Sequence, residues 1–251
     1  MRVCVLSSGS RGNTTYIESE NAKILIDVGN SAKYVKEKLE EIGTLPEEID
    51  AVLITHTHSD HVKGLKTFAK KYGISIYVTD IMLDSLDYLD NYTILSDDFD
   101  IKDIHVTSIR TSHDAPDSRG YVISSCNKSV VYITDTGYIN SRYFDILKNR
   151  DLYIMESNHD VEMLNNGSYP FQLRQRILSD KGHLSNYDSA KYLSSFVGSN
   201  TKCIMLAHLS EDNNTEDLAY DTLVKRLNDS DIHIDKIIIA KQNKETEIVN
   251  V

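Results

Sequence analysis

The residues best suited to chemistry in this sequence occupy six positions directly after an apolar run. They are three imidazoles and one carboxylate, at His56, His58, Asp60 and His61. Neutral imidazole and carboxylate are ligands that borderline divalent metals such as Zn²⁺ accept. Because residues two apart share a face of an extended segment, His56 and His58 can point at one ion. If the chain then turns into a helix, Asp60 and His61 can reach a neighbouring ion, so this stretch predicts half of the ligands of a dinuclear centre.

The alternative for this stretch is a solvated loop that happens to be rich in histidine. The chain has nine histidines in 251 residues. At that frequency, three histidines and one aspartate at fixed offsets should arise by chance in roughly one such chain in a thousand. We therefore prefer the metal site.

Two predicted elements would hold this stretch in place, a buried strand before it and a helix after it. Ala51–Ile54 is wholly apolar, which favours a buried strand. Residues 62–72 place Leu65 and Phe68 on one face and end before Gly73, which predicts a helix. Elsewhere the same patterns predict strands at 3–6, 14–17, 23–26, 74–78, 104–109, 120–125, 129–133, 152–155, 203–207 and 236–240, and helices at 31–42, 82–89, 138–148, 171–178, 187–196 and 215–227.

The composition is that of an ordinary globular protein. Apolar residues make up 40% and charged residues 26%, and no apolar run approaches the ~20 residues that a membrane-spanning helix needs. No repeat, low-complexity segment or linker divides the chain, so we expect one domain over residues 1–251. Cys4, Cys126 and Cys203 are far apart in apolar surroundings, which predicts reduced core thiols in a cytoplasmic protein.

The net charge of −11 argues against a basic surface that coats nucleic acid. Phosphodiesters remain allowed as substrates, because bound metal ions supply local positive charge. Any groove for nucleic acid would have to be local, and its candidate residues are Arg11, Arg119, Arg174, Arg176 and the lysines near residue 70. Those lysines are equally typical of a solvated helix face.

The segment from Ser7 to Asn13 combines small residues with two glycines. Backbone N–H groups can converge in such a segment and form an anion-binding nest. A plain hairpin turn is the alternative. Arg11 favours a phosphate contact, and we expect Ser8, Ser10 and Arg11 to contact substrate.

The spacing His56-x-His58-x-Asp60-His61 after a strand resembles the signature of the metallo-β-lactamase superfamily. This resemblance implies an α/β (α+β) fold, a four-layer αββα sandwich of two mixed β-sheets flanked by helices. The metal site of such a sandwich lies at the strand ends. Three further residues match the remaining ligand motifs of the superfamily by their places after predicted strands: His113, Asp135 and His208.

The resemblance implies two ions that share Asp135. One ion would be held by His56, His58, His113 and Asp135, and the other by Asp60, His61, His208 and Asp135. A carboxylate can bridge because each of its oxygens can serve one ion. Asp27, ahead of a glycine at a strand end, is expected to support the site by hydrogen bonding near the ligand loop. A turn carboxylate is the alternative for Asp27.

Two ions about 3.5–4 Å apart would share a bridging hydroxide as nucleophile and stabilise charge on the attacked group. Zn²⁺ or Mn²⁺ is expected, with Fe or Ni as further candidates. Asp60 is expected to act in catalysis as well as in binding. His183, in a Gly-His loop, is the candidate general acid because its ordinary pKa suits proton donation near neutral pH. A helix cap or a stacking role is the alternative for His183.

The polar segment from Glu156 to Asp160 follows a buried strand and should line the same edge of the sandwich. We do not expect it to supply a metal ligand. Substrate contact by Asn158, His159 or Asp160, or support of the ligands by one of them, is weighed against a capping role. Ser185 is expected to contact substrate or to cap the helix that follows.

Within the superfamily, four segments resemble the YycJ (WalJ) branch over nearly the whole chain. They are residues 7–13, 156–160 and 182–186, and residues 207–210 with Asn213 and Asn214. The branch implies a cytoplasmic 5′→3′ DNA exonuclease with Mn²⁺ or Zn²⁺ as metal, and a link to DNA-repair proteins. The spacing between Asp135 and His208 leaves no room for a large capping domain, and no long exosite arm is evident.

Two other functions compete with a DNA phosphodiesterase. The first is a small-molecule metallo-hydrolase that cleaves a thioester, lactone or cyclic phosphodiester, which an enclosed pocket would favour. The second is a catalytically silent interaction protein, which a complete set of seven ligands disfavours.

Overall fold

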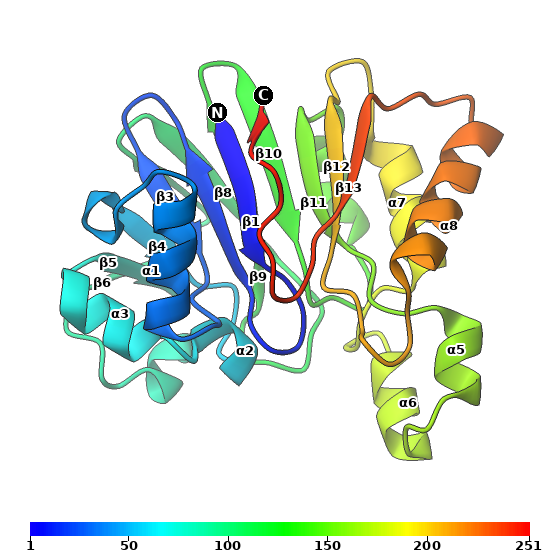
Figure 1. Ribbon diagram of the computed structural model, residues 1–251, viewed down its shortest axis with the longest axis horizontal. Helices are drawn as coiled ribbons and strands as arrows, with labels where there is room; N and C mark the ends of the chain where they lie inside the picture. The colour runs from blue at the N-terminus through cyan, green and yellow to red at the C-terminus, as the bar shows by residue number, and fades with distance from the viewer.

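The computed structural model describes all 251 residues. Two seven-stranded β-sheets face each other, and helices cover the outer face of each (Figure 1). The first sheet has the spatial order β14 (Val249–Asn250), β1 (Arg2–Ser7), β2 (Thr14–Glu18), β3 (Lys23–Ile26), β4 (Ala51–Leu53), β5 (Ser75–Val78) and β6 (Tyr92–Ile94). The second has the order β13 (Lys236–Ile239), β12 (Cys203–Ala207), β11 (Leu152–Glu156), β10 (Lys128–Ile133), β9 (Arg119–Ser125), β8 (Ile104–Arg110) and β7 (Asp98–Ile101).

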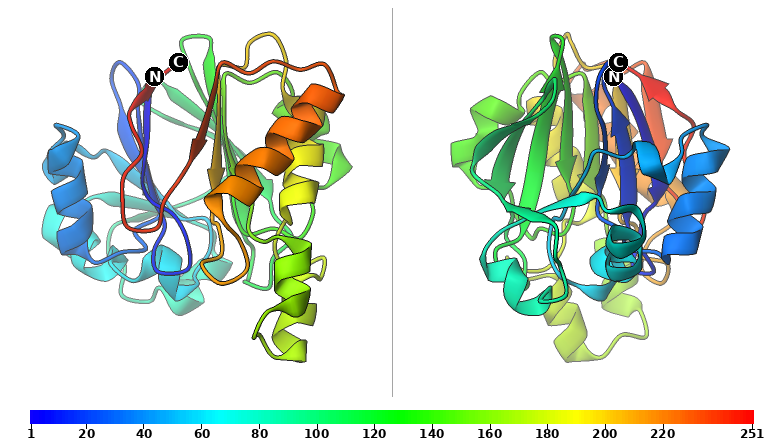
Figure 2. Two further views of the ribbon diagram at one scale, coloured as in Figure 1. Left: turned by 45° about the vertical axis from the view of Figure 1, so that its right-hand side comes forward. Right: turned by 90° about the vertical axis from the view of Figure 1, so that its left-hand side faces the viewer.

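Both sheets are mixed. Strands β14, β1, β2 and β3 pair antiparallel, whereas β3 to β6 pair parallel. Strands β7 to β10 pair antiparallel, whereas β10 to β13 pair parallel. The pairing of β14 with β1 brings the two termini together, and the Met1 amino group donates to the Val251 carbonyl at 2.8 Å. Figure 2 shows both termini at the edge of the sandwich opposite α5 and α6.

Helices α1 (Ala32–Glu41) and α3 (Leu65–Tyr72) cover the first sheet, and α7 (Asn186–Phe196) and α8 (Glu216–Asp229) cover the second (Figure 1). The shorter helices are α2 (Ser59–Val62), α4 (Phe144–Leu147), α5 (Val161–Asn166) and α6 (Phe171–Ile177), with 3-10 turns η1 (Pro46–Glu48), η2 (Ile81–Ser85) and η3 (Ser141–Tyr143). No helix has both the length and the apolar character that crossing a bilayer requires.

The alternation of side chains along each strand divides the core into layers. In β1, Val3 and Val5 pack between the sheets, whereas Cys4 and Leu6 pack in the layer beneath α1 and α3. Because the central strands are buried on both faces, they read as continuous apolar runs. A slip of one residue would exchange the two faces of a strand. The burial therefore fixes the register, and with it the positions of the polar residues that follow each strand.

The expected αββα sandwich and all expected strands are present, but several helices differ from the prediction. Residues 82–89 form only the 3-10 turn η2, and residues 138–148 form η3 and α4 in place of one helix. Strands β6, β7 and β14 and helix α5 were not expected. All three residues of β6 are exposed, so no apolar alternation marks it.

The helix expected at 62–72 is interrupted, so that α2 and α3 are separate. Gly64 lies between them, and a Cβ atom there would come within 2.0 Å of the Asn30 carbonyl oxygen. The backbone of this turn therefore packs directly on the loop before α1. This contact holds the loop of residues 56–61 against the first sheet.

Candidate metal centre

Polar side chains from both sheets meet at one edge of the sandwich, where successive strands end. Asp27 follows β3, residues 56–61 follow β4, His113 follows β8, Asp135 follows β10, Glu156 ends β11 and His208 follows β12. Asp27, Asp135 and His208 have left-handed φ angles of 60°, 55° and 57°. A non-glycine residue in this region costs about 1–3 kcal/mol and persists only where its surroundings hold it, most often at functional sites.

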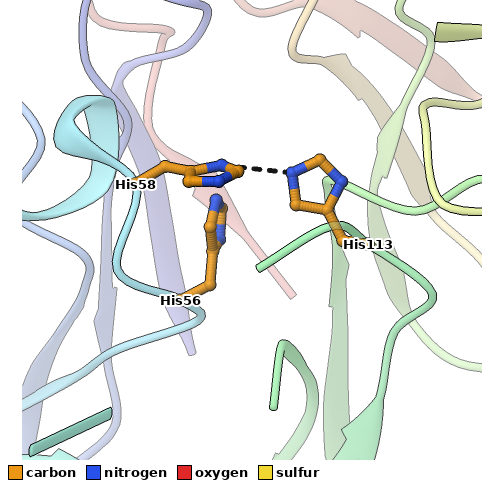
Figure 3. A group of neighbouring side chains, drawn as sticks. All are labelled: His56, His58 and His113. Atoms are coloured by element: carbon orange, nitrogen blue, oxygen red, sulfur yellow. Dashed lines mark hydrogen bonds between the residues drawn. The ribbon is translucent and has the colours of Figure 1, made fainter. Parts of the chain in front are cut away.

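Three histidines from opposite sheets form the first group of the cluster. Figure 3 shows His56 and His58 from the loop after β4 and His113 from the loop after β8, with their rings turned toward one another. The ring centroids are 4.7–5.1 Å apart, and His113 Nε2 lies 3.3 Å from His58 Nδ1. One ring nitrogen from each histidine lies within 4.8 Å of the others. Three nitrogens at that spacing can bind one ion.

Asp60, His61 and His208 form the second group, again with ligand atoms within 4.8 Å of one another. Asp60 Oδ2 lies 3.5 Å from His61 Nε2 and 3.7 Å from His208 Nε2. Asp135 lies between the two groups. Its Oδ2 is 3.3 Å from His61 Nε2, and its Oδ1 is 3.8 Å from His113 Nε2. Oδ1 also lies 3.6 Å from His208 Nδ1, so the Asp135 carboxylate contacts histidines of both groups, as a shared ligand would require.

The hydrogen bonding of the cluster fits bound cations. His56 Nε2, His208 Nε2 and Asp135 Oδ2 are buried and have no hydrogen-bond partner within the protein. Leaving a buried polar atom unpaired costs about 1–3 kcal/mol. Three such atoms meeting in one cluster are best explained as ligand atoms.

The other ring nitrogens are engaged in contacts that orient the imidazoles. His56 Nδ1 lies 3.1 Å from Thr55 Oγ1, His113 Nδ1 donates to the Gly182 carbonyl at 3.2 Å, and His208 Nδ1 lies 2.9 Å from Glu156 Oε1. Partners of this kind fix the tautomer and leave the second nitrogen for a metal.

Asp27 orients the imidazole of His61 in the same way. It is fully buried, and its Oδ2 lies 2.7 Å from His61 Nδ1. Thr55 donates to it through its backbone N–H at 2.8 Å and its hydroxyl at 2.7 Å. The structure therefore brings Asp27 to the place where the sequence analysis expected support for the ligand loop.

The electrostatics also fit a cationic occupant. Burial and the neighbouring imidazoles lower the pKa of His56 well below its ordinary value, so its ring is neutral. Burial also acts to lower the pKa of His208, but Asp135, Asp60 and Glu156 outweigh it and raise this pKa to about 10. The buried carboxylates thus hold a proton on His208. This proton indicates that the cluster carries excess negative charge, which bound metal ions would neutralise.

Glu156 is the functional residue that the sequence analysis missed. It is fully buried, and its Oε1 lies 2.8 Å from His183 Nδ1 and 2.9 Å from His208 Nδ1. Its Oε2 accepts from the backbone N–H groups of Leu184 and Thr136. Burial raises its pKa, but His183 and His208 outweigh burial and lower it to about 2. A carboxylate closing a wholly buried strand needs partners, and that signal was present in the sequence.

The cluster opens into a cleft of about 240 Å³. Its walls are formed by Ser10, His58, Asp60, His113, Asp135, Asn158, Tyr169, Leu173, Arg176, Ile177, His183, His208, Leu209 and Ser210. The candidate general acid His183 thus faces the cleft, and so do two of the residues expected to contact substrate, Ser10 and Asn158.

The other residues expected to contact substrate do not line the cleft. Ser8 is buried and its hydroxyl accepts from the His208 backbone N–H at 2.7 Å. Ser185 is buried and caps α7 by accepting from the Asp188 N–H. His159 is 1% exposed, and Arg11 forms an exposed ion pair with Glu211.

Most of the arginines and lysines considered for a local nucleic-acid groove do not lie at the cleft. Arg119 was proposed as part of it, and this is wrong, because Arg119 is buried and binds both carboxylate oxygens of Asp117. Lys66 and Lys70 line a different hollow beside Tyr88. Of the arginines and lysines considered, Arg176 alone lines the cleft.

Comparisons with known proteins agree with this architecture. The family described as "Beta-lactamase superfamily domain" matches residues 22–205. The exodeoxyribonuclease WalJ of Streptococcus pneumoniae is 41% identical over 240 residues, which cover 92% of this chain and 89% of the relative. The exodeoxyribonuclease YycJ of Bacillus anthracis is 38% identical over 223 residues, which cover 86% and 84%. The metallo-β-lactamase fold protein YhfI of Bacillus subtilis superimposes with a TM-score of 0.73 at 17% identity, over 98% of this chain and 99% of its own, which shows a shared fold.

Proposed function

Since the chain belongs to the β-lactamase superfamily, in the group of the exodeoxyribonucleases WalJ and YycJ, we propose that it is a metal-dependent exonuclease that hydrolyses DNA. The proposal includes the 5′→3′ direction, a cytoplasmic location and an association with DNA-repair proteins, all of which rest on the resemblance to this group. The buried free thiols of Cys4 and Cys203 support the location, whereas Cys126, which was expected in the core, is exposed.

The observation that carries the proposal is the convergence of seven candidate ligands beside the His183–Glu156 pair. Five of the seven and His183 line one open cleft. Two divalent cations are proposed, with Zn²⁺ or Mn²⁺ preferred because imidazole and carboxylate suit both. They would be held by His56, His58 and His113, by Asp60, His61 and His208, and by Asp135 between the two groups. When bound, the ions would activate a water as nucleophile and stabilise charge on the attacked phosphate.

His183 is proposed as the general acid. Its Nδ1 lies 2.8 Å from the Glu156 carboxylate, which leaves Nε2 to donate a proton. That proton would go to the oxygen that leaves when the P–O bond breaks. Glu156 orients the ring, and by binding His208 as well it couples the acid to the metal cluster.

The substrate-binding residues proposed are Ser10 and Asn158, which line the cleft. Asn158 donates through Nδ2 to the His208 carbonyl at 2.9 Å, so its position is tied to a candidate ligand. Ser8 is proposed to act through His208, whose N–H it binds. Ser185 and His159 are proposed to shape the loop behind the cleft, where their backbones form a β-bridge.

A second candidate function is hydrolysis of a small phosphodiester by the same cluster. The cleft volume of about 240 Å³ and its single arginine favour this candidate, because a groove that tracks a long backbone is usually rich in cations. The two candidates differ in substrate length but share the chemistry.

The test is hydrolysis by metal-loaded protein of four substrates: 5′-phosphorylated duplex DNA, the single strand, RNA of the same sequence, and bis(p-nitrophenyl) phosphate. Mn²⁺ and Zn²⁺ are compared. We expect stepwise release of mononucleotides from DNA. Cleavage of the small diester with no release from any DNA would overturn the exonuclease proposal in favour of the small substrate. Endonucleolytic fragments would overturn the proposal that the enzyme works from an end.

A further inference from the structure

Arg176 is the only arginine or lysine among the residues that line the cleft. It lies on α6, which projects beyond the strand ends on the metal side of the sandwich (Figures 1 and 2). Its side chain is about half exposed. Every other ionisable group in the wall is an imidazole, a carboxylate or the phenol of Tyr169, so Arg176 is the one guanidinium or ammonium group that an anionic substrate meets there.

One side of the guanidinium is already engaged. Arg176 Nε donates to Asp114 Oδ2, while the two terminal amino groups have no hydrogen-bond partner in the protein. Asp114 directly follows His113, and its Oδ1 lies 3.4 Å from His113 Nε2 and 3.7 Å from His58 Nε2. One carboxylate therefore separates Arg176 from two candidate metal ligands. These two amino groups of the guanidinium are free to bind two oxygens of one phosphate.

The neighbours of Arg176 on α6 suit a nucleotide. Leu173 and Ile177 of α6 line the cleft with it, at the spacing that places residues on one side of a helix, and Tyr169, just before the helix, lines the cleft as well. Aromatic and apolar side chains beside a cation form the usual contact surface for a base and its phosphate in a single strand. These residues line the same cleft as His183 and the metal cluster, and the His183 backbone N–H donates to the Ile177 carbonyl at 3.0 Å.

We propose that Arg176 binds the phosphate of the nucleotide next to the bond that is cut, and that Asp114 holds the guanidinium in position for it. The inference rests on the proposed function and adds to it the residue that selects a nucleic acid strand over an isolated phosphodiester. Asp114 is then a positioning residue, because it acts through Arg176.

The competing role for the Arg176–Asp114 pair is structural, as a clamp between α6 and the loop of His113. The two roles differ in their dependence on the substrate. Loss of a clamp would lower hydrolysis of every substrate to the same degree. Loss of a phosphate contact would penalise only substrates that carry a second phosphate.

The experiment compares Arg176→Gln with Arg174→Gln, which removes the same charge from the same helix but outside the cleft. Each metal-loaded protein is assayed on a single-stranded oligonucleotide and on bis(p-nitrophenyl) phosphate, which has no second phosphate. Metal content and Tm are measured for both variants. Binding of a fluorescent oligonucleotide is measured by anisotropy over a range of salt concentrations.

We expect Arg176→Gln to raise KM and Kd for the oligonucleotide about 10- to 100-fold, as for loss of a charged hydrogen bond. The loss on the oligonucleotide should be at least ten times the loss on the small diester. The slope of log Kd against log salt should fall by about 0.7, the value for one phosphate contact on a single strand. Arg176→Lys should keep that slope, because it keeps the charge. Arg174→Gln should change neither substrate more than about threefold.

Equal losses on both substrates, or an unchanged Kd and salt slope, would overturn the inference. Failure of the proposed function is seen separately, in the wild-type protein, as absence of DNA hydrolysis. Even then the anisotropy measurement decides the role of Arg176, because it needs no turnover.

Discussion

At the buried contact between Asp27 and His61, a change of one atom should weaken metal binding without altering a candidate ligand. Asp27 accepts from Thr55 N, Thr55 Oγ1 and His61 Nδ1 at 2.7–2.8 Å. Because a carboxylate only accepts, the contact with Asp27 keeps a proton on His61 Nδ1, and Nε2 is the nitrogen left to bind a metal in exchange for its own proton. Burial acts to lower the pKa of His61, but the carboxylates of Asp135 and Asp27 outweigh it and raise this pKa well above its ordinary value. That Nε2 lies 3.3 Å from Asp135 and 3.5 Å from Asp60, in the second ligand group.

Asp27→Asn keeps the shape of the side chain but turns one acceptor into a donor. With the amide NH₂ facing His61 Nδ1, the ring proton moves to Nε2 and occupies the side that a metal needs. Affinity for the second ion should fall about 10- to 100-fold, or about 1.4–2.8 kcal/mol. The two bonds at this position would be inverted and would lose the carboxylate charge, at about 1 kcal/mol each, which should destabilise the metal-free protein by about 2 kcal/mol and lower Tm by about 4–8 °C.

The assay is a Zn²⁺ titration of metal-free protein against a chromogenic chelator, with Tm measured by calorimetry. Asp221→Asn, on the exposed face of α8, is the matched control and should change neither quantity. A lowered Tm with both metal affinities unchanged would refute the tautomer reasoning. Unchanged Tm would refute the assignment of those hydrogen bonds to stability.

Three other changes test the site. His183→Ala should lower turnover about 10²- to 10⁴-fold with metal content unchanged; a lost ion, measured by plasma mass spectrometry, would make His183 a ligand instead. Asp135→Ala should empty both metal positions, and retention of one full equivalent in the same measurement would contradict its shared position. Gly29→Ala should reduce both Tm and activity, because its Cβ would lie 1.8 Å from the Asp60 carbonyl oxygen; wild-type values for both would show that the loop moves freely.

The fold was predictable from the sequence because its strands are buried on both faces. Runs such as residues 203–207 carry an unmistakable apolar signal, and burial on two sides fixes the register. The strands that were not predicted lack this apolar pattern. Exposed β6 has no buried face, and β14 is a two-residue pairing with β1 that only the closed sandwich creates.

The candidate ligands were predictable because each is a polar residue directly after a strand. Their partners were harder to foresee. Glu156 was read as part of a polar loop, yet it binds two histidines that lie 27 and 52 positions away in the sequence. Arg119 and Arg176 cannot be told apart from the sequence. In the structure Arg119 is buried and bonded to Asp117, whereas Arg176 is bonded to Asp114 and lines the cleft. Such outcomes depend on tertiary contacts that residue type and spacing do not encode.

The central claim is that seven side chains from the ends of two sheets hold a pair of cations needed for phosphodiester hydrolysis. The most direct measurement is a titration of metal-free protein with Zn²⁺ or Mn²⁺, at a protein concentration far above the metal Kd, while hydrolysis of single-stranded DNA is followed. Activity should rise from zero and level off at two equivalents per chain. Full activity without metal, or a plateau at one equivalent, would contradict the account.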